Sequence, residues 1–307
     1  MPSNLNGRYP YMPYTDRPKL YWPDGKRIAF WVAPNIEFYE LQPPGPRTGW
    51  FRPVPDTLHY GWRDYGNRVG VWRMMDVMAK HGVRASVSLN VALMDHYPEI
   101  IDAGNKLGWE WFSHGTYNTR FITGMSSEQE RELIRDSAET ILKHSGQKLS
   151  GWLGPSLSMS DTIIDNLAAE GLDYTLDLFH DDQPTPIRVK QGRLISIPYS
   201  FVVNDALMFH IWGVSPSEYL DTMKAQFDRL YAEGADNATV MGVPLHPYLI
   251  AQPNRIAVFD ELLAYVTGHE GVWLPTAREI AEYYYVHHYD RVVAHYDALE
   301  ENRHAGA

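Results

Sequence analysis

Short apolar runs alternate with longer segments of helical spacing along most of the chain. Runs of strand length occur at residues 27–33, 83–90, 109–115, 149–155 and 172–177, and again at 193–200, 206–212, 237–247 and 272–275. Between them, apolar residues recur at three- and four-residue intervals, which is the spacing of an amphipathic helix. These helical segments are 68–82, 96–108, 126–146, 160–171, 215–234, 255–271 and 276–289.

Regular alternation of strands and helices indicates parallel strands joined by crossover helices. About seven such repeats favour an α/β fold, specifically a distorted or incomplete (β/α)7 barrel, over an open sheet. We predict one catalytic barrel domain at residues 26–285. An extended N-terminal arm rich in Pro, Tyr and Asn precedes it at 1–25, and a C-terminal helix or tail follows at 286–307.

Residues 41–66 are dense in proline, glycine and aromatic residues. A loop of this length inside a compact domain is usually functional or disordered, and its aromatic content favours a function. Its aromatic side chains are candidates for a lid over a substrate, with packing beneath the loop as the alternative. They are Trp50, Phe51, His59, Tyr60 and Trp62.

The amino-acid composition restricts the kinds of molecule that the protein is expected to bind. The formal net charge is −11 and no dense basic stripe is present, which argues against nucleic acid. The chain has no cysteine, so disulfides and thiolate metal sites are excluded. The N-terminus lacks the pattern of a signal peptide, and no apolar run approaches the length of a membrane helix. We expect a cytoplasmic protein that acts on a small molecule and does not bind membranes.

Polar residues stand directly after five of the predicted strands. In parallel α/β folds, active sites gather beyond the carboxyl ends of the strands, so these side chains are expected to converge. One isolated histidine would be a weak signal. A carboxylate and two histidines at three strand ends are a stronger one. The residues are Asn35 and Glu37, His114 and Asn118, Pro155 and Ser156, Asp177, and His246.

The order of these elements resembles the polysaccharide deacetylase (NodB-homology) superfamily, whose fold is a distorted barrel of seven strands. Its metal-dependent members carry an Asp pair after the first strand and a His-x-x-x-His pair after a later one. This chain has Asn35-Ile36-Glu37 at the first position, and Asn118 where the second histidine would stand. "GWLGPS" also lacks the usual arginine, whereas "GVPLHP" with His246 matches.

The chain is more similar to the branch of cofactor-independent allantoinases and cyclic-imide hydrolases. "DYGNRVGVW", "DLFHDDQP" and "IPYSFVVND" resemble motifs of that branch, and the resemblance runs from about residue 18 to 285. It implies an amidohydrolase that acts on carbon–nitrogen bonds of a cyclic amide, imide or ureide, and it also favours a homo-oligomer. The segments around 45–62 and 154–160 differ from the allantoinases.

Chemistry without a metal is the hypothesis that fits these residues. Zinc would need three protein ligands, and Glu37, His114 and Asn118 are the available set, but a neutral amide is a poor third ligand. We therefore expect no cofactor, with zinc or another divalent metal as the alternative. Glu37, with a pKa raised by burial, would be the general base, and His246 the acid for the departing nitrogen. His114 would polarise the carbonyl or share the base role.

The other candidates would bind the substrate. Asn35, Asn118 and backbone amides near Pro155 and Ser156 are candidate oxyanion donors. Arg68 would bind a second carbonyl or a carboxylate. The remaining candidates are Asp177, Trp62 and Tyr65.

Two alternatives remain open. One is a metal-dependent deacetylase of N-acetyl sugars or polysaccharide. The other is an inactive barrel that keeps its mouth as a ligand-binding pocket.

Overall fold

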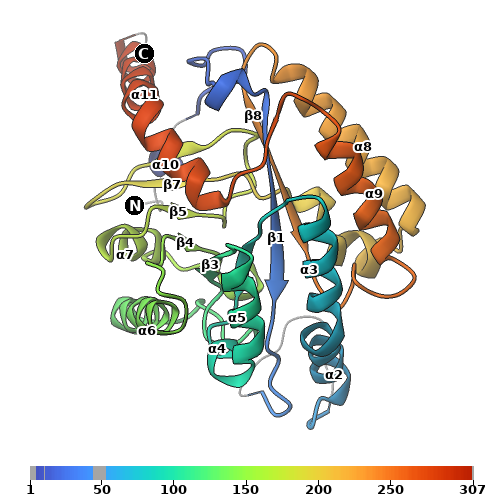
Figure 1. The fold of residues 1–307 in the computed structure, drawn as a ribbon. Helices are drawn as coiled ribbons and strands as arrows, with labels where there is room; N and C mark the ends of the chain where they lie inside the picture. Colours follow the sequence, from blue (N-terminus) through green and yellow to red (C-terminus); the bar gives the residue numbers. More distant parts are fainter. Residues whose placement is uncertain (1–4, 10, 44–52, 306–307) are drawn as a thin grey trace.

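The structure is a computed structural model that describes residues 5–9, 11–43 and 53–305 (Figure 1). Its strands are β1 (Ile28–Ile36), β2 (Ser86–Leu89), β3 (Glu110–Ser113), β4 (Gly151–Trp152), β5 (Tyr174–Thr175), β6 (Thr185–Ile187), β7 (Leu194–Ser196), β8 (Thr239–Leu245) and β9 (Val272–Trp273). They form one sheet in the order β6-β7-β5-β4-β3-β2-β1-β8, and β9 pairs with β1. All described pairings are parallel except that of β6 with β7.

Helices cover the outside of the curved sheet (Figure 1). The described α-helices are α1 (Leu5–Arg8), α2 (Thr57–Tyr65), α3 (Val71–Lys80), α4 (Leu93–His96), α5 (Pro98–Lys106), α6 (Ser127–Ser145), α7 (Ile163–Ala169), α8 (Pro216–Glu233), α9 (Ile256–Thr267), α10 (Ala277–His287) and α11 (Tyr289–Ala305). Short 3-10 and π segments join them, including η2 (Gly66–Gly70), η3 (Pro155–Leu157), η4 (Phe201–Val203) and η5 (Ala206–Ile211).

The incomplete barrel predicted from the sequence is confirmed, with two differences in its strands. The segment 206–212, predicted as a strand, is the π-helical segment η5. A short apolar run does not distinguish a strand from a buried helical turn, and Asn204 stabilises the helical start because its Oδ1 accepts from the Ala206 amide at 2.9 Å. The antiparallel strand β6 was not predicted.

Helix α6 shows why several helix limits were predictable. Ser126 and Gln129 form a reciprocal capping box at its start, and Gly146 ends it in the left-handed conformation at φ 71°. Only glycine adopts that conformation without strain, so the predicted segment 126–146 and the observed helix agree.

Strand β1 continues three residues beyond the predicted end at Ala33. Pro34 lacks a backbone N–H and was expected to terminate pairing. Its register partner on β8 is Leu245, and the carbonyl of Leu245 accepts from the Asn35 side-chain Nδ2 at 3.3 Å. Beyond the proline, Asn35 and Ile36 pair with Ser88 and Leu89 of β2, so the strand continues on that side to Ile36.

The predicted loop 41–66 contains a helix, since residues 57–65 form α2. Asp56 caps this helix by accepting from the amide of His59 at 3.1 Å. The lid candidates Trp50 and Phe51 lie outside the described residues. Figure 1 places α2 near the carboxyl end of β1, which is the end that carries the predicted site.

The N-terminal arm packs on its own chain. Trp22 is buried, and its indole N–H donates to the carbonyl of Thr239 at the start of β8. Helices α10 and α11 lie beside the arm, where Tyr284 and Tyr296 are buried in the same cluster as Trp22. This packing occupies the end of the barrel opposite α2 (Figure 1).

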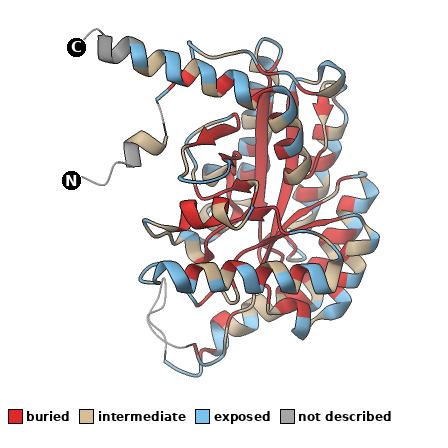
Figure 2. Cartoon of the chain, turned by 90° about the vertical axis from the view of Figure 1, so that its left-hand side faces the viewer, coloured by how far each residue is buried: buried red, intermediate tan, exposed pale blue. Residues whose placement is uncertain are grey.

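The strands are buried on both faces, whereas the helices turn one face inward and one outward (Figure 2). In a barrel of parallel strands, helices cover the outer face and side chains fill the interior, so both faces of each strand are buried. Within the described part of the chain, no helix combines the length and apolar character that crossing a membrane requires.

Two glycines on neighbouring helical segments provide a matched test of this packing. A Cβ on Gly70 of η2 would lie 2.1 Å from the carbonyl oxygen of Pro247, next to His246, whereas a Cβ on Gly61 of α2 would meet nothing within 4 Å. We expect Gly70→Ala to lower the free energy of unfolding by about 1–3 kcal/mol because the backbones must separate. Gly61→Ala should raise it by about 0.5–1 kcal/mol. Equal effects of the two substitutions in urea denaturation would contradict this packing.

Candidate active site

Three polar side chains stand at the same edge of the sheet. Glu37, His114 and His246 are each the first residue after their strands β1, β3 and β8. All three are buried, with exposed fractions of 5%, 3% and 7%. The charge of Glu37 acts to raise the pKa of both histidines, and both histidines act to lower the pKa of Glu37, so the three lie close together as the sequence analysis expected.

Glu37 is held by two hydrogen-bond donors. Its Oε2 accepts from Arg63 Nε and from the Tyr248 hydroxyl, both at 3.1 Å. Its Oε1 lies 3.6 Å from His246 Nε2. Burial by itself would raise the pKa of Glu37, but His246 and Arg63 outweigh burial and hold its pKa well below the usual range. The expectation of a raised pKa is therefore wrong, and Glu37 is a carboxylate at neutral pH.

His246 forms the centre of a charged chain. Its Nδ1 is 2.6 Å from Asp205 Oδ1, and its backbone amide donates to Asp205 Oδ2 at 2.8 Å. Burial alone would lower the pKa of His246, but the carboxylates of Asp205 and Glu37 together raise it to about 9. The imidazole is thus a cation at neutral pH, with Nε2–H directed at Glu37.

His114 has the opposite character. Its Nδ1 lies 2.9 Å from the carbonyl of Leu153, an acceptor that requires the proton on Nδ1. Burial lowers the pKa of His114 despite the attraction of Glu37, so the ring is neutral and Nε2 carries a lone pair. A lone pair can accept a proton but cannot polarise a carbonyl. Of the two roles predicted for His114, this geometry favours the base.

Asn118 lies beside His114 with its backbone held on two sides. Its amide donates to the carbonyl of Phe38 at 3.2 Å, and its carbonyl accepts from the Ser156 hydroxyl at 3.4 Å. The side chain is only 6% exposed. Its Oδ1 is buried and has no hydrogen-bond partner among the described residues.

Two of the other predicted oxyanion donors, the Asn35 side chain and the Gly154 amide, are already engaged. Asn35 Nδ2 donates to the Tyr199 hydroxyl at 2.9 Å and to Leu245, so this side chain joins β1 to its neighbours. The amide of Gly154 donates to Asp177 Oδ1 at 2.7 Å, and Pro155 has no N–H. Asp177 therefore shapes the turn after β4.

That turn is strained. Ser156 has φ 51°, which is uncommon for a residue with a side chain. Asp177, which anchors it through Gly154, also accepts from the Thr175 hydroxyl at 2.9 Å. Burial raises the pKa of Asp177 to about 6 in spite of these two hydrogen bonds.

Residues predicted from the segment 62–68 divide into two groups. Trp62 faces the site, since its ring lies 5.8 Å from that of Tyr248 and 5.0 Å from that of His210. Arg68 points outward, with its side chain 66% exposed and paired with Asp64. The hydroxyl of Tyr65 accepts from Arg73 and contacts none of the three central residues among the described hydrogen bonds.

Arg63, to which the sequence analysis gave no role, is the arginine at the site, and it pairs with Glu37. It reaches Glu37 from α2, with its guanidinium 4.7 Å from the ring centre of Tyr248 and 5.1 Å from that of Tyr39. The sequence does contain a signal for this difference. Residues five apart on a helix point in different directions, so Arg63 and Arg68 were not to be expected on the same side. Sequence reasoning also gave no role to Asp205 and Tyr248, although both stand in or next to motifs that it singled out.

The donor set does not fit a zinc ion. Glu37 Oε2 is engaged by Arg63 and Tyr248, His246 is protonated, and Asn118 offers only a neutral amide. Across residues 5–9, 11–43 and 53–305, no three imidazole or carboxylate groups are placed so that they could hold a metal. Zinc in catalytic sites takes three protein ligands, and the alternative set of Glu37, His114 and Asn118 does not provide them.

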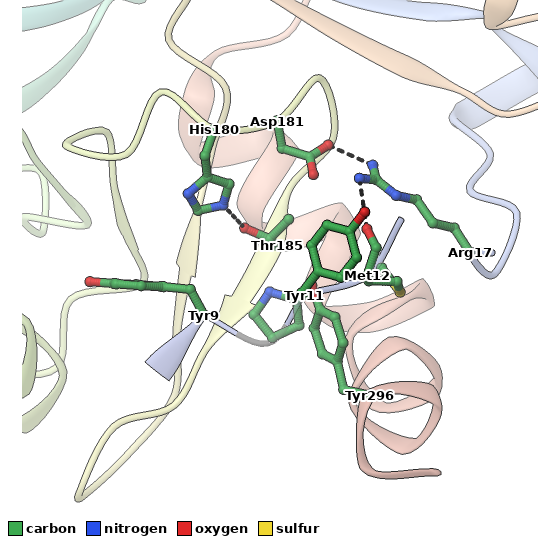
Figure 3. Close-up of a pocket in the computed structure, with 9 residues that line it drawn as sticks. Tyr9, Tyr11, Met12, Arg17, His180, Asp181, Thr185 and Tyr296 are labelled. Atoms are coloured by element: carbon green, nitrogen blue, oxygen red, sulfur yellow. Dashed lines mark hydrogen bonds and ion pairs between the residues drawn. The ribbon is translucent and has the colours of Figure 1, made fainter. Parts of the chain in front are cut away.

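A separate cavity of about 280 Å³ lies between the N-terminal arm, the loop before β6 and α11 (Figure 3). Tyr9, Tyr11 and Tyr296 contribute to its walls. Arg17 and Asp181 form an ion pair at 2.7 Å within it, so their charges compensate each other. None of the predicted site residues lines this cavity.

Known proteins resemble the chain in sequence and in fold. The family model described as polysaccharide deacetylase matches residues 60–175. A protein of Schizosaccharomyces pombe named as a polysaccharide deacetylase is 29% identical over 250 residues, which is 75% of this chain and 77% of that protein. These matches confirm the resemblance to the polysaccharide deacetylase superfamily.

Solved structures share the fold. A crystal structure of a Pseudomonas aeruginosa PAO1 protein, named as a polysaccharide deacetylase, has TM-score 0.82 and 24% identity, covering 94% of this chain and 99% of that one. PuuE allantoinase has TM-score 0.80 and 23% identity, covering 89% and 95%. The distorted barrel is thereby confirmed, and together the matches support a hydrolase of carbon–nitrogen bonds.

The protonation of His246 gives a test of the charged chain. Replacing Asp205 by Asn removes the charge that opposes the effect of burial, so the pKa of His246 should fall from about 9 by roughly 1–3 pH units. The imidazolium would then lose its proton at lower pH than in the unaltered protein. NMR titration of the His246 ring measures this directly. Asp260→Asn, at the distant Lys80 pair, is the control and should leave the titration unchanged.

Proposed function

We propose that this protein hydrolyses a carbon–nitrogen bond in a small cyclic amide, imide or ureide, and does so without a metal ion. The observation that carries the proposal is the buried pair formed by the Glu37 carboxylate and the His246 imidazolium, 3.6 Å apart. One member can accept a proton and the other can donate one, which are the two transfers that amide hydrolysis requires.

The first step is attack of water on the substrate carbonyl. The water oxygen bonds to the carbonyl carbon while its proton passes to Glu37 Oε1, the oxygen that Arg63 and Tyr248 leave open. The low pKa of Glu37 keeps it ionised but makes it a weak base. The neutral Nε2 of His114 can share the role by orienting the same water.

The second step breaks the carbon–nitrogen bond. The tetrahedral intermediate collapses, and the departing nitrogen takes the proton from His246 Nε2. Asp205 holds the imidazole in place and stabilises its charged form beforehand. The proton on Glu37 then returns to His246, and the new carboxylic acid ionises, which restores the starting state.

Cyclic imides and ureides suit a site of this kind. The electron-withdrawn nitrogen is a better leaving group than that of a sugar acetamide, and ring strain makes the carbonyl easier to attack, so less electrophilic assistance is needed. The structural likeness to PuuE allantoinase supports this substrate class. The second candidate, deacetylation of an N-acetyl sugar, is favoured by the matched family but needs a metal site that these donors do not form.

A substrate panel tests the proposed reaction. We expect turnover of cyclic ureides or imides, and Glu37→Gln and His246→Ala should each lower kcat by about 10²–10⁴-fold because each removes a proton-transfer group. Glu128→Gln, on an exposed position of α6, is the control for the loss of a carboxylate. If both central substitutions leave hydrolysis of every ureide, imide and acetamide unchanged, the protein is not the enzyme proposed.

Metal removal separates the two candidate reactions. Because no described donor set fits zinc, dialysis against a chelator should leave the hydrolysis of the ring substrate unchanged, and added zinc should not raise kcat. Metal content is measured by elemental analysis of the same samples. Stoichiometric zinc together with loss of activity on chelation would favour the deacetylase instead.

A further inference from the structure

We propose that the carboxamide of Asn118 binds the amide edge of the substrate ring through two hydrogen bonds. Oδ1 would accept from a ring N–H, and Nδ2 would donate to the carbonyl oxygen beside that N–H. This inference rests on the proposed function and narrows its substrate class to rings that present a free N–H next to a carbonyl.

The unpartnered oxygen is the observation behind this proposal. Asn118 is 6% exposed, and its Oδ1 has no hydrogen-bond partner among the described residues. Buried polar atoms in proteins are almost always satisfied, and an exception at a functional site indicates a missing partner. An acceptor oxygen needs a donor, and the N–H of an amide, imide or ureide is one.

The position of Asn118 fits such a contact. The amide of Asn118 is bonded to the carbonyl of Phe38, the residue directly after Glu37. Its carboxamide also interacts with the His114 ring, and because the proton of that ring is on Nδ1, the interaction is with Asn118 Nδ2 and leaves Oδ1 without a partner among the described residues. The backbone is held on its other side by Ser156. Because the main chain is anchored between the loops after β1 and β4, the carboxamide is fixed next to the groups that handle the proton.

The carboxamide of Asn118 is complementary in hydrogen bonding to the amide edge of the proposed substrate ring. It presents one acceptor and one donor side by side, so its complement presents a donor and an acceptor side by side. A secondary amide has that arrangement only when it is cis. Open-chain secondary amides are almost entirely trans, whereas a small ring forces the cis form. The acetamido group of a sugar therefore cannot pair with Asn118 at both points.

Neighbouring groups do not offer the same pairing. The amide of Asn35 is consumed by Tyr199 and Leu245, and the amide of Gly154 is consumed by Asp177. His114 presents only an acceptor at Nε2. Asn118 thus combines a buried acceptor with a donor on a single side chain at this edge of the sheet.

The experiment compares succinimide and hydantoin with their N-methyl analogues on the full-length protein. In the unaltered enzyme, methylating the ring nitrogen that Asn118 binds should lower kcat/KM by about 10–100-fold, mainly through KM. The reason is that Asn118 Oδ1 is then left without a donor. Asn118→Leu keeps the shape of the side chain but has no polar atoms. This variant should lose activity on the N–H ring, and methylation should then change kcat/KM by less than about 3-fold.

Asn118→Asp provides a second variant, because it keeps an acceptor and loses the donor. It should still discriminate against the N-methyl ring at any level of activity that remains. Thermal unfolding of each variant verifies that it is folded. If Asn118→Leu rejects the N-methyl analogue as strongly as the unaltered enzyme does, the discrimination is steric and the proposal is overturned.

Failure of the proposed reaction gives a different result. In that case the unaltered protein hydrolyses none of the rings, and calorimetric titration with the same N–H and N-methyl compounds replaces turnover. Weaker binding of the N-methyl ring to the unaltered protein, with no such difference in Asn118→Leu, supports the contact. Binding of neither ring, or equal binding of both by the unaltered protein, overturns it.

Discussion

The register between β1 and β8 is the constraint on which the site depends. Ile28 pairs with Thr239 and Pro34 with Leu245, so the two strands end at nearly the same level. Glu37 and His246 follow these ends and face each other at 3.6 Å. A slip by one residue would turn one of them to the other face of the sheet. At the last pair of this register, the side chain of Asn35 donates to the carbonyl of Leu245.

Charge balance explains how so many ionised groups tolerate burial. Glu37 and Asp205 are carboxylates, while His246 and Arg63 are cations, and the four contact one another in a chain. Burying one charge alone would be costly, but a chain of alternating sign with filled hydrogen bonds compensates most of that cost. A divalent metal bound by Glu37 would add two positive charges to a cluster that is already neutral.

Two helical segments outside the strand–helix repeat complete the site. Helix α2 brings Arg63 and Trp62 over Glu37, and the start of η5 brings Asp205 to His246. The strands supply the groups proposed to transfer protons, whereas these segments set their pKa values.

The amino-acid sequence by itself determined the class of fold and the three central residues. Alternation of apolar periods identifies parallel strands with crossover helices, and the residue after a buried parallel strand lies at the edge where sites form. Glu37, His114 and His246 were therefore identifiable without coordinates. Local capping signals, such as Ser126 and Gly146, likewise set the limits of α6.

Only the tertiary structure decided the protonation states and the supporting residues. The pKa of Glu37 depends on Arg63 and His246, which are 26 and 209 residues away in the sequence, so no local pattern reports it. That Arg63 reaches Glu37 while Arg68 points outward depends on which side of α2 and η2 turns inward. That Asn118 retains an unpaired oxygen is likewise a property of the packed chain, because burial and partners exist only after folding.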